Sequence, residues 1–348
     1  MNIGVLFSGQ GAQYPGMGKS LYEHSAAARR VLDEAGAEVK AQCFEAAAEE
    51  LKQTAITQPC VYAVGMAAYA AFLEALSAQG LMVPHVEQAP EQPKGSSGES
   101  QLVLAGVAGF SLGEYAALTA AGIIGDVPKG VALVRERGRL MQAAGTSKTG
   151  EAKGGMMAAM GQRESILTYV ESARGDGILE AVNFNAPGQT VVAGDFAALG
   201  RFAEVAKRNR IKAMRLPVSA AFHSPMMAPA AEPLRQLLLD ATLSAPTLKC
   251  YCNVTGQDLF AGNAIPAEGL AAYVADMMAR QVKSPVYWQE TIENMMRDGI
   301  QAVVECGPGK ALRGLAKKIA PDLPAFYVED AESLQETIEA LNEMLPRA

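Results

Sequence analysis

The sequence predicts an α/β protein, in which a large domain built on a mostly parallel sheet carries a smaller inserted subdomain. Short apolar runs alternate with helical patterns along most of the chain, a pattern typical of parallel α/β sheets. The 348 residues suit two domains, or one large domain with an insertion. One segment instead shows a strand–helix–strand–strand–helix–strand order. We therefore predict a large domain of residues 1–150 and 217–348 and a small subdomain of residues 151–216.

The chain begins with a short buried strand, residues 3–7, followed by a glycine-rich loop over residues 8–13. The backbone amides around Gln10 in this loop have no bulky neighbours, so they are candidates to stabilise a negatively charged oxygen. Gly18-Lys19-Ser20 resembles the end of a P-loop, but Gln13 stands where that motif requires its first glycine. Nucleotide hydrolysis is therefore not indicated.

A helical region follows and ends in a polar stretch. Residues 27–80 are predicted to form helices, most clearly over 58–77, where Ala, Val, Met and Leu predominate. That composition favours a helix packed in the core. Residues 84–101 are polar, aperiodic and rich in Pro, Gly and Ser, which predicts a flexible surface loop.

The most informative segment is Gly109-Phe110-Ser111-Leu112-Gly113, which follows an apolar strand over residues 102–108 and leads directly into a helix. A buried strand that ends at Gly-x-Ser-x-Gly and turns into a helix is typical of the nucleophile elbow of α/β hydrolases. Ser111 would lie at a helix N-terminus, where free backbone N–H groups face it. The bare five-residue pattern is equally compatible with an ordinary strand-to-helix turn. We predict an α/β-hydrolase-like large domain with Ser111 as its candidate nucleophile.

The remainder of the chain first builds the small subdomain and then returns to the large domain. After a helix over 127–144, the segment from Gly145 to Gly155 is a plausible boundary. The small subdomain is predicted from strand 156–160, helix 163–174, strands 178–184 and 189–193, helix 196–208 and strand 211–216, which is the ferredoxin-like order. The large domain is then predicted to resume with a helix that ends near Leu239. It continues with a strand over 248–254, a helix over 267–279, strands over 300–306 and 324–328, and a final helix over 333–344.

A serine nucleophile needs a general base, which is most often histidine. The chain has three histidines, His24, His85 and His223. We favour His223, because it occupies a tight turn where the large domain resumes and because serine before histidine is the chain order of the hydrolases. No Asp or Glu stands out as a third member, so a backbone carbonyl is a candidate to orient the imidazole.

Net charge and cysteine content limit the classes of partner and site that the chain can have. The net charge of −7 argues against a nucleic-acid partner, and no membrane partner or membrane span is expected. The five cysteines are widely spaced without a Cys-x-x-Cys pair, so neither a disulfide framework nor a zinc site is indicated. We expect a cytoplasmic monomer with no metal.

Several motifs occur together and in one order along the chain, at residues 7–13, 111–115, 137–138, 185–189, 221–224, 280–281, 285–286 and 305–309. In this combination the sequence resembles the malonyl-CoA:acyl-carrier-protein transacylases, the acyltransferases of fatty-acid and polyketide synthesis. The resemblance extends from residue 7 to about residue 318. It is far more specific than the elbow alone.

The resemblance implies a ping-pong acyl transfer without a cofactor, in which malonyl-CoA is a substrate. Ser111 would take the malonyl group and His223 would shuttle the proton, oriented by the main-chain carbonyl of Gln281. The amides of Gln10 and Leu112 would form the oxyanion hole.

The resemblance also implies how the substrate is bound. Arg137 would pair bidentately with the malonyl carboxylate, as a planar guanidinium can. Phe222 resembles the malonyl-selective form, while Asn185, Gln281 and Phe110 would line the substrate site. Phe110 departs from the family, which usually has histidine there, and the loop 84–101 is longer than usual.

The implied second substrate is an acyl carrier protein, which is acidic and bears phosphopantetheine. A cationic face on the helix after Gly309 is a candidate docking surface, formed by Lys310, Arg313, Lys317 and Lys318. A solvated helix face is the alternative for these residues. For the whole protein the alternatives are a serine esterase or thioesterase, a methylmalonyl-tolerant polyketide acyltransferase, and a non-catalytic module that binds carrier protein.

Overall fold

The computed structural model describes residues 1–81, 101–218, 220–262 and 267–345. The loop predicted over 84–101, which includes His85, lies outside the described residues apart from Gln101. All other elements expected from the sequence fall within them.

The large domain is built on a five-stranded sheet whose neighbouring strands are all parallel, in the order β7-β2-β1-β8-β9. The strands are β1 (Asn2–Phe7), β2 (Val103–Gly109), β7 (Lys249–Tyr251), β8 (Ala302–Cys306) and β9 (Ala325–Val328). A parallel sheet is covered by helices on both faces, and β1 and β8 are accordingly buried almost throughout. The predicted α/β fold with a mostly parallel sheet is confirmed.

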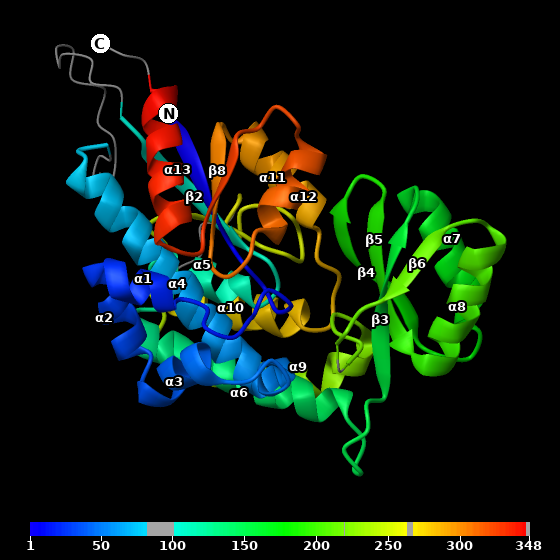
Figure 1. Cartoon of the computed structure of the whole chain (residues 1–348). Helices are drawn as coiled ribbons and strands as arrows, with labels where there is room; N and C mark the ends of the chain where they lie inside the picture. Colours follow the sequence, from blue (N-terminus) through cyan, green and yellow to red (C-terminus); the bar gives the residue numbers. More distant parts are fainter. Residues whose placement is uncertain (82–100, 219, 263–266, 346–348) are drawn as a thin grey trace.

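Helices surround this sheet (Figure 1). They are α1 (Lys19–His24), α2 (Ala26–Glu34), α3 (Ala37–Glu45), α4 (Thr54–Ala78), α5 (Gly113–Ala120), α6 (Val127–Gly145), α9 (Ala228–Leu239), α10 (Ala267–Gln281), α11 (Trp288–Arg297), α12 (Ala311–Ile319) and α13 (Ala331–Met344), with 3-10 turns at Glu50–Lys52 and Pro225–Met227. Side-chain caps start three of these α-helices: Ser25 accepts from Ala28 in α2, Asp126 accepts from the third residue of α6, and Asp330 forms a capping box with Ser333 in α13. Helix α11 was not expected, although its buried Trp288, Ile292 and Met295 follow helical spacing.

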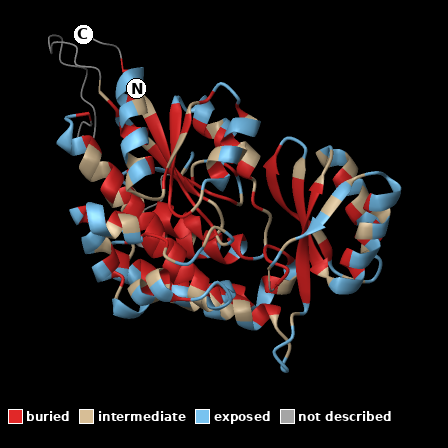
Figure 2. Cartoon of the chain, viewed as in Figure 1, coloured by how far each residue is buried: buried red, intermediate tan, exposed pale blue. Residues whose placement is uncertain are grey.

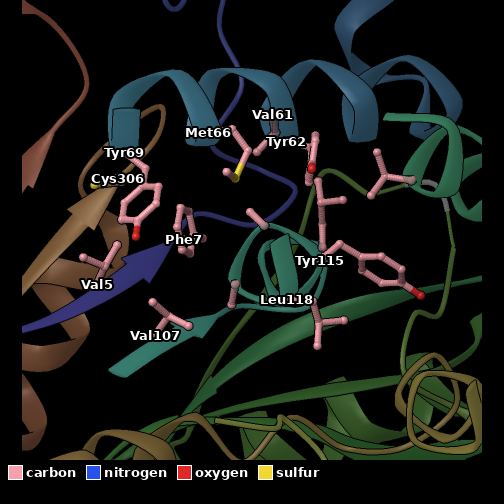
Figure 3. Packing of buried hydrophobic residues seen from close by; sticks show 14 of the residues in the cluster. Val5, Phe7, Val61, Tyr62, Met66, Tyr69, Val107, Tyr115, Leu118 and Cys306 are labelled. Atoms are coloured by element: carbon pink, nitrogen blue, oxygen red, sulfur yellow. The ribbon is translucent and has the colours of Figure 1, made fainter. Parts of the chain in front are cut away.

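The long helix α4 forms the centre of the core on one face of the sheet. Figure 3 shows it lying across the ends of β1 and β2 and over α5, with Tyr69 packed edge-on against Phe7 at 5.6 Å between ring centroids. By length and composition α4 could cross a membrane, which the sequence analysis had not anticipated. However, 72% of its most apolar window is buried inside the protein, so α4 packs as a core helix.

The small subdomain has its own four-stranded antiparallel sheet, in the order β4-β5-β3-β6. Its elements are β3 (Gly154–Met160), α7 (Arg163–Arg174), β4 (Leu179–Ala186), β5 (Gln189–Asp195), α8 (Phe196–Arg208) and β6 (Lys212–Arg215). Both helices pack on one face of the sheet, and their outer sides are exposed (Figure 2). The predicted ferredoxin-like arrangement is confirmed, and all six elements lie between residues 151 and 216.

Strand β4 joins the small subdomain to the large one. The backbone N–H of Phe184 donates to the carbonyl of Val286 at 2.9 Å, and the Val286 N–H donates to Val182 at 2.8 Å. The Phe184 ring stacks on Tyr287, and the guanidinium of Arg163 lies 3.5 Å from the Phe184 ring centroid. These contacts hold the end of β4 against the large domain.

The glycines of the β2–α5 turn permit a close backbone approach. A Cβ at Gly113 would lie 2.1 Å from the carbonyl oxygen of Phe7 in β1, a distance no real side chain tolerates. A Cβ at Gly200, in the exposed part of α8, would meet nothing within 4 Å.

We predict that Gly113→Ala lowers the free energy of unfolding by about 3 kcal/mol or more, because the added methyl group forces backbone apart. The matched variant Gly200→Ala is expected to raise it by about 0.5–1 kcal/mol, since alanine is the better helix former. Urea unfolding of both variants checks this. Equal effects of the two substitutions would contradict the close packing of the turn.

Candidate active site

The turn between β2 and α5 presents Ser111 in a strained conformation. Its φ of +53° lies in the left-handed region, which non-glycine residues rarely adopt. The side chain of Asn253, just after β7, holds this turn from both sides. Its Oδ1 accepts from the Ser111 N–H at 2.6 Å, and its Nδ2 donates to the Gly109 carbonyl at 2.7 Å. Asn253 thereby stabilises the turn conformation in which the serine hydroxyl points away from the sheet.

His223 lies directly opposite Ser111. The distance between Ser111 Oγ and His223 Nε2 is 2.7 Å, and His223 Nδ1 lies 2.9 Å from the main-chain oxygen of Gln281. A carbonyl oxygen can only accept, so Nδ1 carries the proton and Nε2 of the neutral ring accepts from the Ser111 hydroxyl. A backbone carbonyl thus occupies the place where an acidic side chain orients the histidine of many hydrolases.

The imidazole is kept neutral by its surroundings. His223 is 3% exposed, and burial together with the nearby charge of Arg137 lowers the pKa of His223 to about 4. The ring is therefore unprotonated and able to accept a proton near neutral pH.

Arg137, in the middle of α6, brings a cation to the same place although it is only 1% exposed. Its Nη1 donates to Oε1 of Gln58 at 2.9 Å, and its Nη2 donates to Oε1 of Gln281 at 3.0 Å and to Ser111 Oγ at 3.3 Å. All three acceptors are neutral, and Arg137 forms no salt bridge within the described part of the chain. The site thus holds a desolvated positive charge without a carboxylate partner.

A buried carboxyl group lies behind this cation. Glu114 accepts from Gln281 Nε2 at 3.0 Å and from the Asn253 N–H at 3.3 Å. Burial raises the pKa of Glu114 to about 7, although these hydrogen bonds and the charge of Arg137 oppose the shift. Glu114 therefore compensates the Arg137 charge only partly near neutral pH.

Two adjoining cavities lie at this site, and Ser111 lines the inner one. The inner one, of about 150 Å³, is lined by Ser111, His223 and Arg137 together with Phe222 and ten further residues. The outer one, of about 440 Å³, lies between the glycine-rich loop, β4 and α12. Gln10, Phe110 and Asn185 line both cavities, which places them at the junction. The Phe110 ring packs edge-on against Trp288, with 5.3 Å between centroids.

The two expected oxyanion donors differ in position. Gln10 lines both cavities, whereas Leu112 lines neither of them and is the N-cap residue of α5, directly after Ser111. Within the described residues, neither backbone N–H donates a hydrogen bond. Both amides are therefore available to a bound group.

The cationic residues of α12 differ in their surroundings. Lys310 and Lys318 line the outer cavity, and the Lys318 ammonium donates to Gln189 at 3.2 Å. The Arg313 side chain instead donates to the Ala325 carbonyl and lies over Tyr327. Lys317 is exposed and lines neither cavity.

The structure thus brings together the residues that the sequence had placed far apart. Sequence reasoning missed Asn253 and Gln58. The buried amide of Asn183 also lines the inner cavity; it begins the turn 183–189 that the sequence suggested could reach over Ser111, but no role was assigned to Asn183 itself. Glu114 lies within one of the sequence motifs, but no role was expected for it. The described residues hold no cluster of three His, Cys, Asp or Glu side chains that would suit a metal ion.

Comparison with known proteins matches the chain to acyltransferases. A family model described as an acyl transferase domain matches residues 95–318. The malonyl CoA-acyl carrier protein transacylase of Haemophilus influenzae is 34% identical over 343 residues, which cover 97% of this chain and 98% of that protein. The transacylase of the same name from Bacillus subtilis is 33% identical, with 98% of each chain covered.

Solved structures agree with the sequence matches. The crystal structure of the malonyl CoA-acyl carrier protein transacylase from Clostridium perfringens has a TM-score of 0.83 at 34% identity, covering 99% of this chain and 98% of its own. A malonyl-transacylase in complex with a type II PKS acyl-carrier protein has a TM-score of 0.81 at 31% identity, covering 98% and 100%.

We predict that His223 makes the protein less stable as the pH falls from 6.5 towards 4. Its pKa is lower in the folded than in the unfolded state, so the unfolded chain binds more protons in this window. The free energy of unfolding of the wild type, relative to His223→Gln at each pH, should fall by about 3 kcal/mol between pH 6.5 and pH 4. Chemical denaturation across this range measures it, and a difference that stays constant would contradict a buried neutral imidazole.

Proposed function

The chain belongs to the malonyl CoA-acyl carrier protein transacylase family, and from that premise we propose that it transfers malonyl groups through an ester on Ser111. The observation that carries the proposal is the buried, unpaired guanidinium of Arg137, 3.3 Å from the serine hydroxyl that His223 contacts. A plain esterase has no use for a desolvated cation at this position. A substrate with a free carboxylate does.

In the first half-reaction, Ser111 Oγ attacks the thioester carbonyl of malonyl-CoA while His223 Nε2 accepts the hydroxyl proton. The carbonyl oxygen becomes an oxyanion, which the free amides of Gln10 and Leu112 stabilise. When the C–S bond breaks, the imidazolium returns its proton to the thiolate of coenzyme A. The main-chain oxygen of Gln281 holds the ring throughout, because it accepts from Nδ1.

In the second half-reaction, the phosphopantetheine thiol of an acyl carrier protein enters through the outer cavity. His223 removes its proton, and the sulfur attacks the serine ester. The tetrahedral intermediate collapses with return of the proton to Ser111 Oγ, which regenerates the free enzyme. The same two amides serve both intermediates.

Arg137 selects the acyl group. Among the described residues, its three hydrogen bonds leave one Nη1–H and the Nε–H without an acceptor, and the weak contact to Ser111 Oγ frees a further donor when a carboxylate enters. Charge-assisted bidentate pairing is strong in a site that excludes water. Malonyl groups are thus favoured over acetyl groups.

Further residues shape the acyl site. Phe222, Asn185 and Phe110 line the inner cavity, where the Phe222 ring would leave little room for an α-methyl group. Gln281 lines neither cavity and would act through its hydrogen bonds with His223 and Arg137. A single methyl group changes selectivity by only about 1–3 kcal/mol, so methylmalonyl-CoA remains a slow substrate.

Carrier protein is proposed to dock at the mouth of the outer cavity, beside Lys310 and Lys318, with Lys317 and Arg313 adding positive charge on α12. A related transacylase has been solved in complex with its carrier protein, which supports this partner. Because the enzyme carries a net charge of −7, a local cationic patch is needed to attract an acidic carrier.

We predict that Arg137→Ala slows formation of the malonyl-enzyme on the order of 10²-fold, because the carboxylate loses its charge-assisted partner. The acetyl-enzyme should form from acetyl-CoA at nearly the wild-type rate. Intact-mass measurement of the adduct over time checks both.

The matched control is Arg135→Ala, two residues earlier on α6, where the guanidinium is exposed and pairs with Glu38. It should leave both rates unchanged. An adduct that persists in Ser111→Ala, or equal losses with malonyl- and acetyl-CoA in Arg137→Ala, would contradict the proposal.

We also predict that Lys318→Glu raises the KM for carrier protein several-fold at low salt, because the reversed charge repels an acidic partner. The comparison variant is Lys212→Glu on β6, at the opposite edge of the small sheet from β4, which should leave this KM unchanged. Steady-state transfer at saturating malonyl-CoA measures both. A KM that does not respond to Lys318→Glu would exclude this docking surface.

A further inference from the structure

A buried carboxyl group links the glycine-rich loop to α12. Glu305, in β8, is 1% exposed and borders the outer cavity. Its Oε1 accepts from the Ser8 hydroxyl at 3.1 Å, and its Oε2 accepts from the backbone N–H of Arg313 at 2.7 Å, with a further backbone hydrogen bond from Leu312. One side chain thus joins two segments that are far apart in sequence and that form opposite walls of the cavity.

Ser8 is the first residue after β1, two positions before the Gln10 amide. It is 4% exposed, and Gly307 approaches so closely that an added Cβ would lie 3.0 Å from Ser8 Oγ. The next residue, Gly9, passes the Phe110 carbonyl oxygen, which a Cβ would approach to 2.5 Å. Beyond this point, within the described residues, the Gln10 side chain donates to Thr54 at 3.3 Å and the Gly11 N–H donates to Gln13 at 2.7 Å. The backbone that leads to the Gln10 N–H is therefore anchored at Ser8 and Gly9.

The other end of the bridge is rigid. Leu312 and Arg313 belong to the first turn of α12, whose free N–H groups need acceptors, and Glu305 supplies them. Helix α12 packs against β8 and β9 through the buried Leu312 and Ala316, on the side of the sheet that faces the small subdomain (Figure 1). Glu305 can therefore serve as a fixed point for the loop.

We propose that Glu305 is a positioning residue that holds the Gln10 amide in the oxyanion hole through the Ser8 hydroxyl. This inference rests on the proposed function, since it requires Gln10 to act as an oxyanion donor. Neither Ser8 nor Glu305 touches the reacting atoms. Their contribution lies in keeping a backbone donor aimed at the place where negative charge develops.

The test uses the single-turnover rate of Ser111 malonylation at increasing malonyl-CoA, followed by intact mass. Ser8→Ala removes the link and leaves the α12 cap in place. We expect its limiting rate to fall about tenfold, less than the 10²–10³-fold cost of deleting an oxyanion donor, with the half-saturating malonyl-CoA concentration unchanged. In Glu305→Gln the hydrogen bond to Ser8 is kept with its direction reversed, because the amide NH₂ can donate to the Ser8 hydroxyl while the amide oxygen still caps α12. We expect a smaller loss, about threefold.

The matched control is Glu329→Gln. This carboxylate holds the same region from outside, accepting from the Gly309 N–H at 2.8 Å and from the Tyr14 hydroxyl at 3.3 Å, without contact to Ser8. It should react at the wild-type rate. A general loosening of the loops would slow it as well, so an equal loss in this control would overturn the inference.

The possible outcomes distinguish a failure of the proposed function from a failure of the inference about Glu305. If the wild type forms no malonyl adduct on Ser111, the proposed function fails. If the wild type reacts but Ser8→Ala and Glu305→Gln react equally fast, only the inference fails. Should Ser8→Ala not fold, Ser8→Cys decides in its place, because a thiol keeps the side chain's bulk but is only a weak hydrogen-bond donor. A lower limiting rate with unchanged half-saturation supports the bridge, and the wild-type rate excludes it.

Discussion

The active site depends on a guanidinium that is held out of water without a carboxylate beside it. A buried, unpaired charge destabilises a fold unless neighbouring groups solvate it. Gln58, Gln281 and the Tyr115 ring, 5.3 Å away, solvate Arg137 in this way, and Glu114 adds only partial charge compensation. Under the proposed function, an acyl group that brings its own carboxylate removes the remaining electrostatic cost. Selectivity for an acidic acyl group would then follow from this unpaired charge.

Gln281 connects this cation to the nucleophile and the base. Its main-chain oxygen orients His223, its side-chain oxygen accepts from Arg137, and its Nε2 donates to Glu114 and to the Ser111 carbonyl at 2.7 Å. The residue ends α10, so a single helix terminus sets the mutual placement of all these groups. The positive charge of Arg137, which is proposed to bind the substrate carboxylate, is also one reason why the His223 imidazole stays neutral near neutral pH.

Local patterns were sufficient to predict the fold and to single out Ser111 and His223, whereas the roles of Arg137 and Gln281 were expected only from the family resemblance. Strand-to-helix alternation revealed the parallel sheet, and the elbow glycines revealed the serine, because the close approach at Gly113 excludes any other residue type. Asn253, Gln58 and Glu305 escaped prediction, since a polar residue acquires such a role only through contacts across more than 70 positions of sequence. Likewise, the apolar composition of α4 would also suit a membrane span, and only its burial in the structure identifies it as a core helix.

The central claim is that one buried cation, one serine and two free amides act on the same acyl group. The most direct measurement is a crystal structure of the enzyme trapped after reaction with malonyl-CoA alone. The account predicts an ester on Ser111 Oγ, with both carboxylate oxygens on the Arg137 guanidinium and the ester carbonyl oxygen within hydrogen-bond distance of the Gln10 and Leu112 amides. A malonyl group whose carboxylate points into the outer cavity, away from Arg137, would contradict it.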